Sequence, residues 1–133
     1  MARILVILIC AAFLTAATPE ETVVFAGVPS VRVDTAGLDP DARRLSPEDG
    51  KKYACRIVAR KKKFYWASRG DKELIRSEAG DFTYFISPEG TGYIKIYKGT
   101  PGGAAPNSLF GYLEQLSSGL KTVTYFGKST AVQ

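Results

Sequence analysis

The side chains that could carry chemistry are unevenly spread along this sequence of 133 residues, which contains 18 lysines and arginines, 13 acids and no histidine. Without histidine, a Ser-His-Asp or Cys-His catalytic arrangement is excluded, and the commonest transition-metal ligand is missing. The two cysteines, Cys10 and Cys55, are too few for a cysteine-based zinc site. We therefore predict no metal site and no cofactor.

The densest group of charged residues is a run of eight cations without an acid, from Lys51 to Arg69. A strong local positive potential attracts polyanions. Three consecutive aromatic residues follow the lysine triplet, and their rings offer flat surfaces on which a base or a sugar can stack. The expected partner is an acidic glycan, a lipid head group or a nucleic acid. The candidate binding residues are Lys51, Lys52, Arg56, Arg60, Lys61, Lys62, Lys63, Tyr65, Trp66 and Arg69.

A solvated turn is the competing interpretation of the same run. Lysines at an exposed turn would pair with the acidic segment of residues 18–50, or would protect a sheet edge from pairing with another chain. Lys61, Lys62 and Lys63 are the residues expected at this turn, because three consecutive lysines are not buried without partners. The sequence leaves both interpretations open.

Carboxylates supply the remaining catalytic hypothesis. A glycosidase-type hydrolase needs two carboxyl groups about 5 to 9 Å apart in a cleft, and Glu73, Glu78 and Asp81 are the candidates. Ser118 and Lys121 have the S-x-x-K spacing of serine β-lactamases, but the partner motifs are absent and the intervening glycine is expected to end a helix. We therefore predict a non-enzymatic interaction module, with a small hydrolase that uses paired carboxylates as the alternative.

The basic run opens a segment, residues 53–98, that alternates as β-strands do. Tyr53, Cys55 and Ile57 share one face of the first stretch, and this period of two predicts a half-buried strand. Cys55 is expected to be a buried small hydrophobe. Glycine, aspartate and proline mark the turns that follow. The further strands are predicted at residues 64–69, 72–78, 82–87 and 93–98.

The C-terminal part predicts one helix and one more strand. Leu109, Phe110, Leu113 and Leu116 repeat at helical spacing after the capping residue Asn107, which predicts an amphipathic helix near residues 107–118. Residues 120–126 alternate again as a strand does, and the tail of residues 129–133 is expected to fray. The predicted fold of residues 51–128 is therefore α+β: an antiparallel β-meander of about five strands with one packed C-terminal amphipathic helix.

The first fifty residues differ in composition from the rest. Residues 1–17 combine an early arginine, a short apolar run and small residues, as a secretory signal peptide does, so we expect an exported chain, periplasmic or extracellular, without a transmembrane span in its mature form. Residues 18–50 hold seven acids and three arginines, interrupted by glycine and proline, and predict a mostly irregular arm. Ser46-Pro47-Glu48-Asp49 predicts a single helical turn within this arm.

Overall fold

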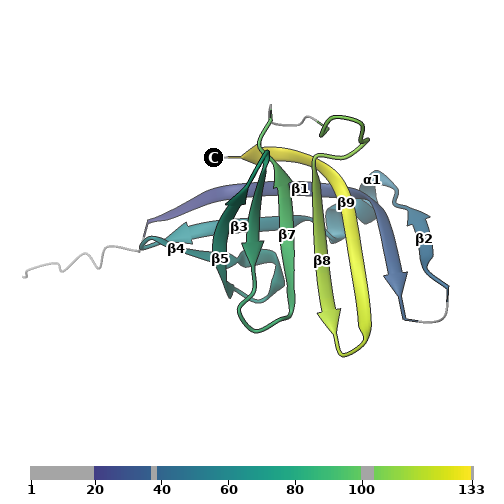
Figure 1. Ribbon diagram of the computed structural model, residues 1–133, viewed down its shortest axis with the longest axis horizontal. Helices are drawn as coiled ribbons and strands as arrows, with labels where there is room; N and C mark the ends of the chain where they lie inside the picture. The colour runs from purple at the N-terminus through teal and green to yellow at the C-terminus, as the bar shows by residue number, and fades with distance from the viewer. Residues whose placement is uncertain (1–19, 37–38, 100–103, 133) are drawn as a thin grey trace, which may run out of the picture.

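The computed structural model describes residues 20–36, 39–99 and 104–132, which form a closed, antiparallel β-barrel (Figure 1). Eight strands make the ring, because the last strand pairs with the first along most of its length. A ninth, short strand pairs with the first strand outside the ring. The expected signal peptide, residues 1–17, lies outside the described residues.

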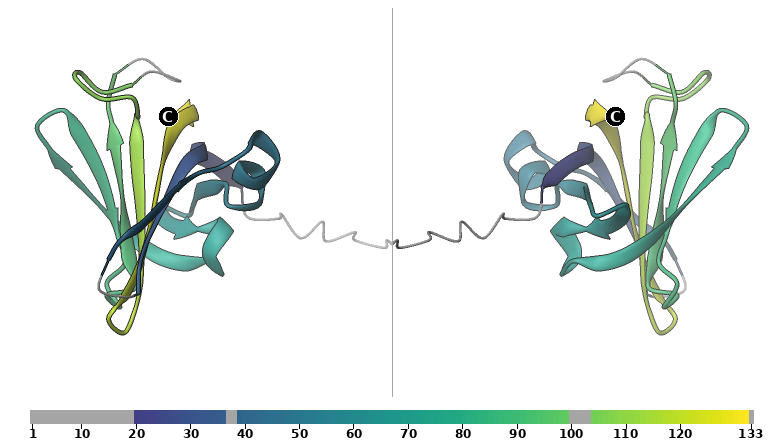
Figure 2. Two further views of the ribbon diagram at one scale, coloured as in Figure 1. Left: turned by 90° about the vertical axis from the view of Figure 1, so that its right-hand side faces the viewer. Right: turned by 90° about the vertical axis from the view of Figure 1, so that its left-hand side faces the viewer.

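The elements follow one another in chain order around the ring, with two short helices in the connections. The ring consists of β1 (Glu21–Thr35), β3 (Cys55–Arg60), β4 (Lys63–Trp66), β5 (Lys72–Ala79), β6 (Phe82–Ile86), β7 (Gly92–Tyr97), β8 (Tyr112–Ser118) and β9 (Lys121–Val132). The remaining elements are β2 (Asp41–Arg44), helix α1 (Pro47–Lys52) and the 3₁₀ turn η1 (Ala67–Arg69). Seen from the side, α1 lies outside the wall of strands (Figure 2).

The predicted α+β class is wrong, because the described residues contain no helix longer than the six residues of α1. The segment predicted as a helix at 107–118 forms a turn followed by β8, which pairs with both β7 and β9. Tyr112 and Glu114 are buried inside the barrel, whereas Leu113 lies on the other face, opposite Phe126 of β9. Apolar residues on both faces of one strand therefore imitate a helical spacing.

The arm predicted to be mostly irregular contains the longest strand of the barrel. β1 pairs with β3 along its first half, with β2 along its second half and with β9 along most of its length. The β1–β9 register shifts after Ala26 and again between Pro29 and Val31. Such bulges let a strand bend around a barrel and accept residues that interrupt a regular ladder. The glycine and proline that indicated irregularity are therefore the residues that bend the strand.

Most of the other local predictions are confirmed. All strands predicted between residues 53 and 98 are present, although the last residues of the second one form η1. The helical turn at Ser46 is α1, in which the Ser46 hydroxyl accepts a hydrogen bond from the Asp49 N–H at 3.1 Å. The expected frayed tail is instead part of β9 up to Val132, because these residues pair with β1.

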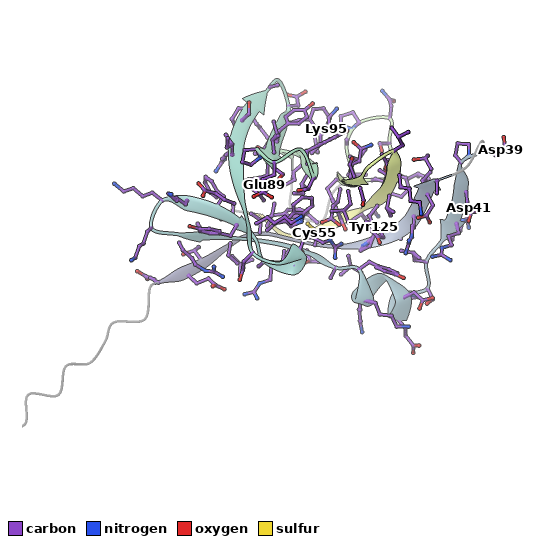
Figure 3. The ribbon with its side chains drawn as sticks, turned by 90° about the horizontal axis from the view of Figure 1, so that it is seen from below. Asp39, Asp41, Cys55, Glu89, Lys95 and Tyr125 are labelled. Carbon is purple, nitrogen blue, oxygen red and sulfur yellow. The ribbon has the colours of Figure 1, made fainter. Side chains whose placement is uncertain are left out.

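The barrel interior is filled by large apolar side chains, and Trp66, Phe25, Phe85 and Ile57 are almost completely excluded from solvent. Cys55 is 1% exposed within the same cluster, so the prediction of a buried thiol is confirmed. Figure 3 shows Cys55 and Tyr125 near the middle of the molecule, far from Asp39 and Asp41 beside β2. Because Trp66 is the sole tryptophan of the chain and lies in this core, its fluorescence reports on the folded state of the core.

We expect the Cys55 thiol to be protected in the native protein. Burial raises its pKa well above the ordinary value, and the neighbouring Glu114 carboxylate raises it further. Since the thiolate is the reactive form, labelling should be slow in buffer and fast in denaturant. The measurement uses the Cys10→Ala protein, with Cys10→Ala/Cys55→Ala/Ser118→Cys, which carries an exposed thiol at the end of β8, as the control. Native labelling of Cys55 as fast as that of the exposed control thiol would contradict the burial.

Candidate binding sites

The lysine triplet lies at the β3–β4 hairpin, at the end of the molecule away from α1 (Figure 1). Arg60 pairs with Lys63, so Lys61 and Lys62 alone form the two-residue turn. Both lysines have left-handed backbone conformations, with φ angles of 49° and 67°. Two-residue hairpin turns of type I′ require positive φ at both central positions, and they favour Asn-Gly there. The predicted turn is therefore real, but its residues are unusual for its shape.

The structure brings together only part of the predicted binding surface. A shallow hollow beside the turn is lined by Arg60, Lys61, Lys63, Tyr65 and Asp71. Lys51 and Lys52 lie on α1, at the other end of the molecule. Trp66 is completely buried, and the Arg69 side chain binds a carboxylate inside the barrel. These four residues are therefore not part of a continuous surface with the hairpin turn.

Most of the cations of the predicted surface have ionic partners. Arg60 binds Glu21 at 2.8 Å and Asp71 at 3.1 Å, and its guanidinium lies over the Tyr65 ring, 5.2 Å from the ring centroid. The further pairs are Arg56–Glu21 at 3.6 Å, Lys63–Glu73 at 3.7 Å and Lys52–Asp49 at 3.1 Å.

The contact with Glu21 is of the kind that the solvated-turn interpretation expects, since this acid belongs to the acidic segment. Glu21 forms ion pairs with Arg56 and Arg60 but not with the two lysines of the turn. Within the described part of the chain, Lys61 and Lys62 have no ion pair, and both are exposed. Two ammonium groups at the hairpin turn are therefore available to a partner.

A second site is a cavity of about 180 Å³ at one mouth of the barrel. It is formed by inward-facing side chains near the ends of β5, β6 and β7 and by one residue of β1, where the β1–β3 register shifts. The lining consists of Val24, Arg76, Glu78, Thr83, Phe85, Ile96 and Lys98.

Charged groups at this mouth converge on one carboxylate. Glu78 accepts hydrogen bonds from Arg76 Nε at 3.0 Å and from Thr83 Oγ1 at 3.3 Å, and it forms ion pairs with Arg76 and Lys98. The hydrogen bond from Lys98, followed by the one from Arg76, lowers the pKa of Glu78. The mouth therefore holds an ionised carboxylate that is surrounded by donors.

The carboxylates named for hydrolysis do not converge. Glu73 lies opposite Tyr65 on the outer face of β5, whereas Glu78 lies opposite Thr83 and faces the cavity. Asp81 is exposed in the β5–β6 turn. Ser118 and Lys121 pair across the β8–β9 turn instead of sharing a helix face. Among the described residues there is also no group of three or more potential acidic, cysteine or histidine metal ligands.

A buried polar network inside the barrel was not anticipated from the sequence. The side chain of Glu114 is completely buried, and its two oxygens accept hydrogen bonds from Trp66 Nε1 at 2.7 Å and Arg69 Nη2 at 2.5 Å. The same Arg69 nitrogen also donates to the Tyr53 carbonyl oxygen at 3.1 Å. Because protein donors occupy both carboxylate oxygens, we assign the network a structural role. In the sequence, the alternation of Tyr112, Glu114 and Leu116 on one face is the pattern that indicates strand β8.

The outer face of β6 to β9 is also rich in aromatic residues, and the loop of residues 104–111 covers part of it. Phe110 of this loop packs against Phe126 with ring centroids 5.4 Å apart. A groove of about 230 Å³ lies between the loop and the strands. Lys95 lines it, with its ammonium 4.3 Å from the centroid of the Phe82 ring, and Figure 3 shows this lysine well away from Cys55. The loop explains why strands with apolar residues on both faces occur here.

Comparison with protein-family models, with curated proteins and with solved structures found no match for this chain. In the described residues, no helix has the length and apolar character needed to cross a membrane. The functional argument therefore depends on the hairpin turn and the barrel mouth.

Proposed function

We propose that this chain is an exported, non-enzymatic binding module that contacts an anionic partner through the β3–β4 turn. Lys61 and Lys62 supply the contact charges, and the pair of Arg60 and Tyr65 lies beside them. The partner is a surface with closely spaced anionic groups, such as an acidic glycan, a lipid head-group layer or a nucleic acid.

The observation that carries this proposal is the left-handed conformation of both lysines. A residue with a Cβ is less stable in this conformation by roughly 1 to 2 kcal/mol, whereas glycine adopts it readily. A Lys-Lys turn therefore gives up stability that Asn-Gly would retain. Departures from local preference are expected mainly at functional sites. The departure here places two unpaired charges at the turn of a hairpin, which supports a role in binding.

The contact should be mainly electrostatic. Ammonium groups on flexible stems act as point charges and do not read the shape of a particular base or sugar. Neutralisation of anionic groups releases counterions, so affinity should fall steeply as salt rises. The stacked Arg60 guanidinium adds a planar donor group near the turn, although Glu21 and Asp71 already bind it.

The test is the double substitution Lys61→Asn/Lys62→Gly. It removes both charges and introduces the residues that the turn favours, so the fold is retained. On an immobilised polyanion at about 0.15 M salt, where charges are already partly screened, the variant should elute earlier than the wild type. The slope of log affinity against log salt should also shrink by about 2, close to one for each cation lost.

The matched control is Lys51→Gln/Lys52→Gln, which removes the same charge from α1 at the other end of the molecule. It should elute like the wild type. Equal losses of retention in the two variants would show that net charge, and not the turn, governs binding. An unchanged elution of Lys61→Asn/Lys62→Gly would reduce the lysines to a solvated turn.

The same double substitution at the turn should also stabilise the protein by about 1 kcal/mol, because it relieves two left-handed lysines. Urea denaturation followed by the fluorescence of Trp66 measures this change. A variant less stable than the wild type would contradict the strain on which the proposal depends.

A further inference from the structure

We propose that the cavity at the barrel mouth binds a small monocarboxylate with an apolar tail of about six carbons. In the absence of ligand, Glu78 occupies the position of the ligand carboxylate. The site uses none of the residues of the β3–β4 turn, so it is independent of the proposed polyanion contact.

The size and floor of the cavity set the class of ligand. Its volume is about 180 Å³, and an apolar cavity of about 150 Å³ is enough to bind benzene. The floor is made by three buried residues, Val24, Phe85 and Ile96, which are 7%, 1% and 2% exposed. Water on such a floor finds few hydrogen-bond partners, so an apolar tail is the better occupant.

The rim supplies recognition of one carboxylate. Arg76 donates from Nε and pairs through Nη2 at 2.9 Å, Thr83 donates from its hydroxyl, and Lys98 adds an ammonium group. All of these groups bind the Glu78 carboxylate, so their positions already fit a carboxylate. Two cations face one acid, and the described residues offer Arg76 and Lys98 no other ionic partner.

Arg76 is held over the cavity independently of Glu78. Its guanidinium lies 5.9 Å from the centroid of the Phe85 ring and 6.0 Å from that of Phe64. A cation fixed by two aromatic rings needs little reorganisation when a carboxylate is exchanged.

Glu78 is well suited to leave the rim. Its side chain is 42% exposed and lies two residues before the β5–β6 turn at Gly80. Exposed ion pairs contribute little to stability, so rotation of this side chain into solvent has a small effect on the fold. A ligand carboxylate would then accept the same hydrogen bonds while its tail covers the apolar floor.

The test follows backbone amide signals by NMR during titration with hexanoate and, separately, with hexanol. Hexanoate should shift the amides of Thr83 and Ile96 in the wild type. Glu78→Gln should bind hexanoate about fivefold more tightly, because the competing charge is gone. Arg76→Met, which keeps an apolar side chain, should bind it at least about fivefold more weakly. Hexanol should bind wild type and Glu78→Gln equally.

Three results would overturn the proposal. The first is that Glu78→Gln binds hexanoate no more tightly than the wild type does. The second is that Glu78→Gln binds hexanol as tightly as it binds hexanoate. The third is that hexanoate shifts no amide signal at the cavity in either the wild type or Glu78→Gln. Lys61→Asn/Lys62→Gly should bind hexanoate like the wild type. A variant that loses polyanion retention but keeps hexanoate binding therefore separates the two sites.

Discussion

Replacing Glu114 with alanine is expected to lower the free energy of unfolding by about 3 to 5 kcal/mol, the usual effect of removing one partner of a buried ion pair. The carboxylate is completely buried and is the acceptor for Trp66 Nε1 and for Arg69. Its loss leaves the Trp66 indole N–H without its acceptor and the Arg69 guanidinium without its anionic partner, with only backbone carbonyl oxygens left to accept from it. Since a domain is stabilised by only about 5 to 15 kcal/mol, the variant should be partly unfolded at moderate temperature. Urea denaturation and thermal unfolding measure the change.

Two further variants separate the network from a general effect of losing an acid. Glu89→Ala, at an exposed position in the β6–β7 turn, should change stability by no more than about 0.5 kcal/mol. Arg69→Met/Glu114→Met removes both charges together and should recover most of the loss, because no uncompensated charge remains buried. Similar effects of Glu114→Ala and Glu89→Ala would show that the network does not stabilise the barrel.

The central meander could be predicted from the sequence because its signals are local. The strands from β3 to β7 alternate with a period of two, and short turns join them. Gly70 and Asp71 both adopt positive φ in the turn that precedes β5, as their residue types indicate. Each of these features depends on fewer than ten consecutive residues.

Closure of the barrel could not be predicted in the same way, because it depends on pairs that are distant in sequence. Ala26 of β1 lies opposite Ala131 of β9, more than a hundred residues away. No local pattern contains that pairing, and without it β1 looks like an arm interrupted by glycine and proline. The same reason applies to Glu114, whose partners lie 45 and 48 residues earlier in the chain.

The same contrast between local features, which could be predicted, and contacts distant in sequence, which could not, applies to the candidate sites. The position of Lys61 and Lys62 in a turn was predictable, but their left-handed conformation and lack of ionic partners were not. Sequence reasoning also placed Trp66 on the binding surface because it follows the lysines, whereas strand alternation turns it inward opposite Ile57. At the barrel mouth, Arg76 and Glu78 share a face of β5, but Lys98 lies just after the end of β7.

Gly92 at the start of β7 is the other position where one substitution should have a large effect. Gly92→Ala is expected to destabilise the protein by about 2 to 6 kcal/mol, the sum of an unfavourable backbone conformation and of overpacking. Its φ is 149°, and an added Cβ would overlap the carbonyl oxygen of Gln115 and lie 3.1 Å from Cη2 of Trp66. The neighbouring strand β8 therefore has to move. Leu116 of β8 is the pairing partner of Gly92, and Glu114 lies two residues before Leu116 in the same strand.

Gly90→Ala is the matched control, because it changes a glycine of the same turn. Gly90 has a φ of 75°, and an added Cβ there would meet nothing within 4 Å. It should therefore lose only the backbone contribution, about 1 to 2 kcal/mol. The difference between the two variants in urea denaturation measures the overlap with β8. Equal losses would mean that β8 shifts without disturbing the core, and that the close approach of the two strands at Gly92 does not hold the buried Trp66–Glu114–Arg69 network in place.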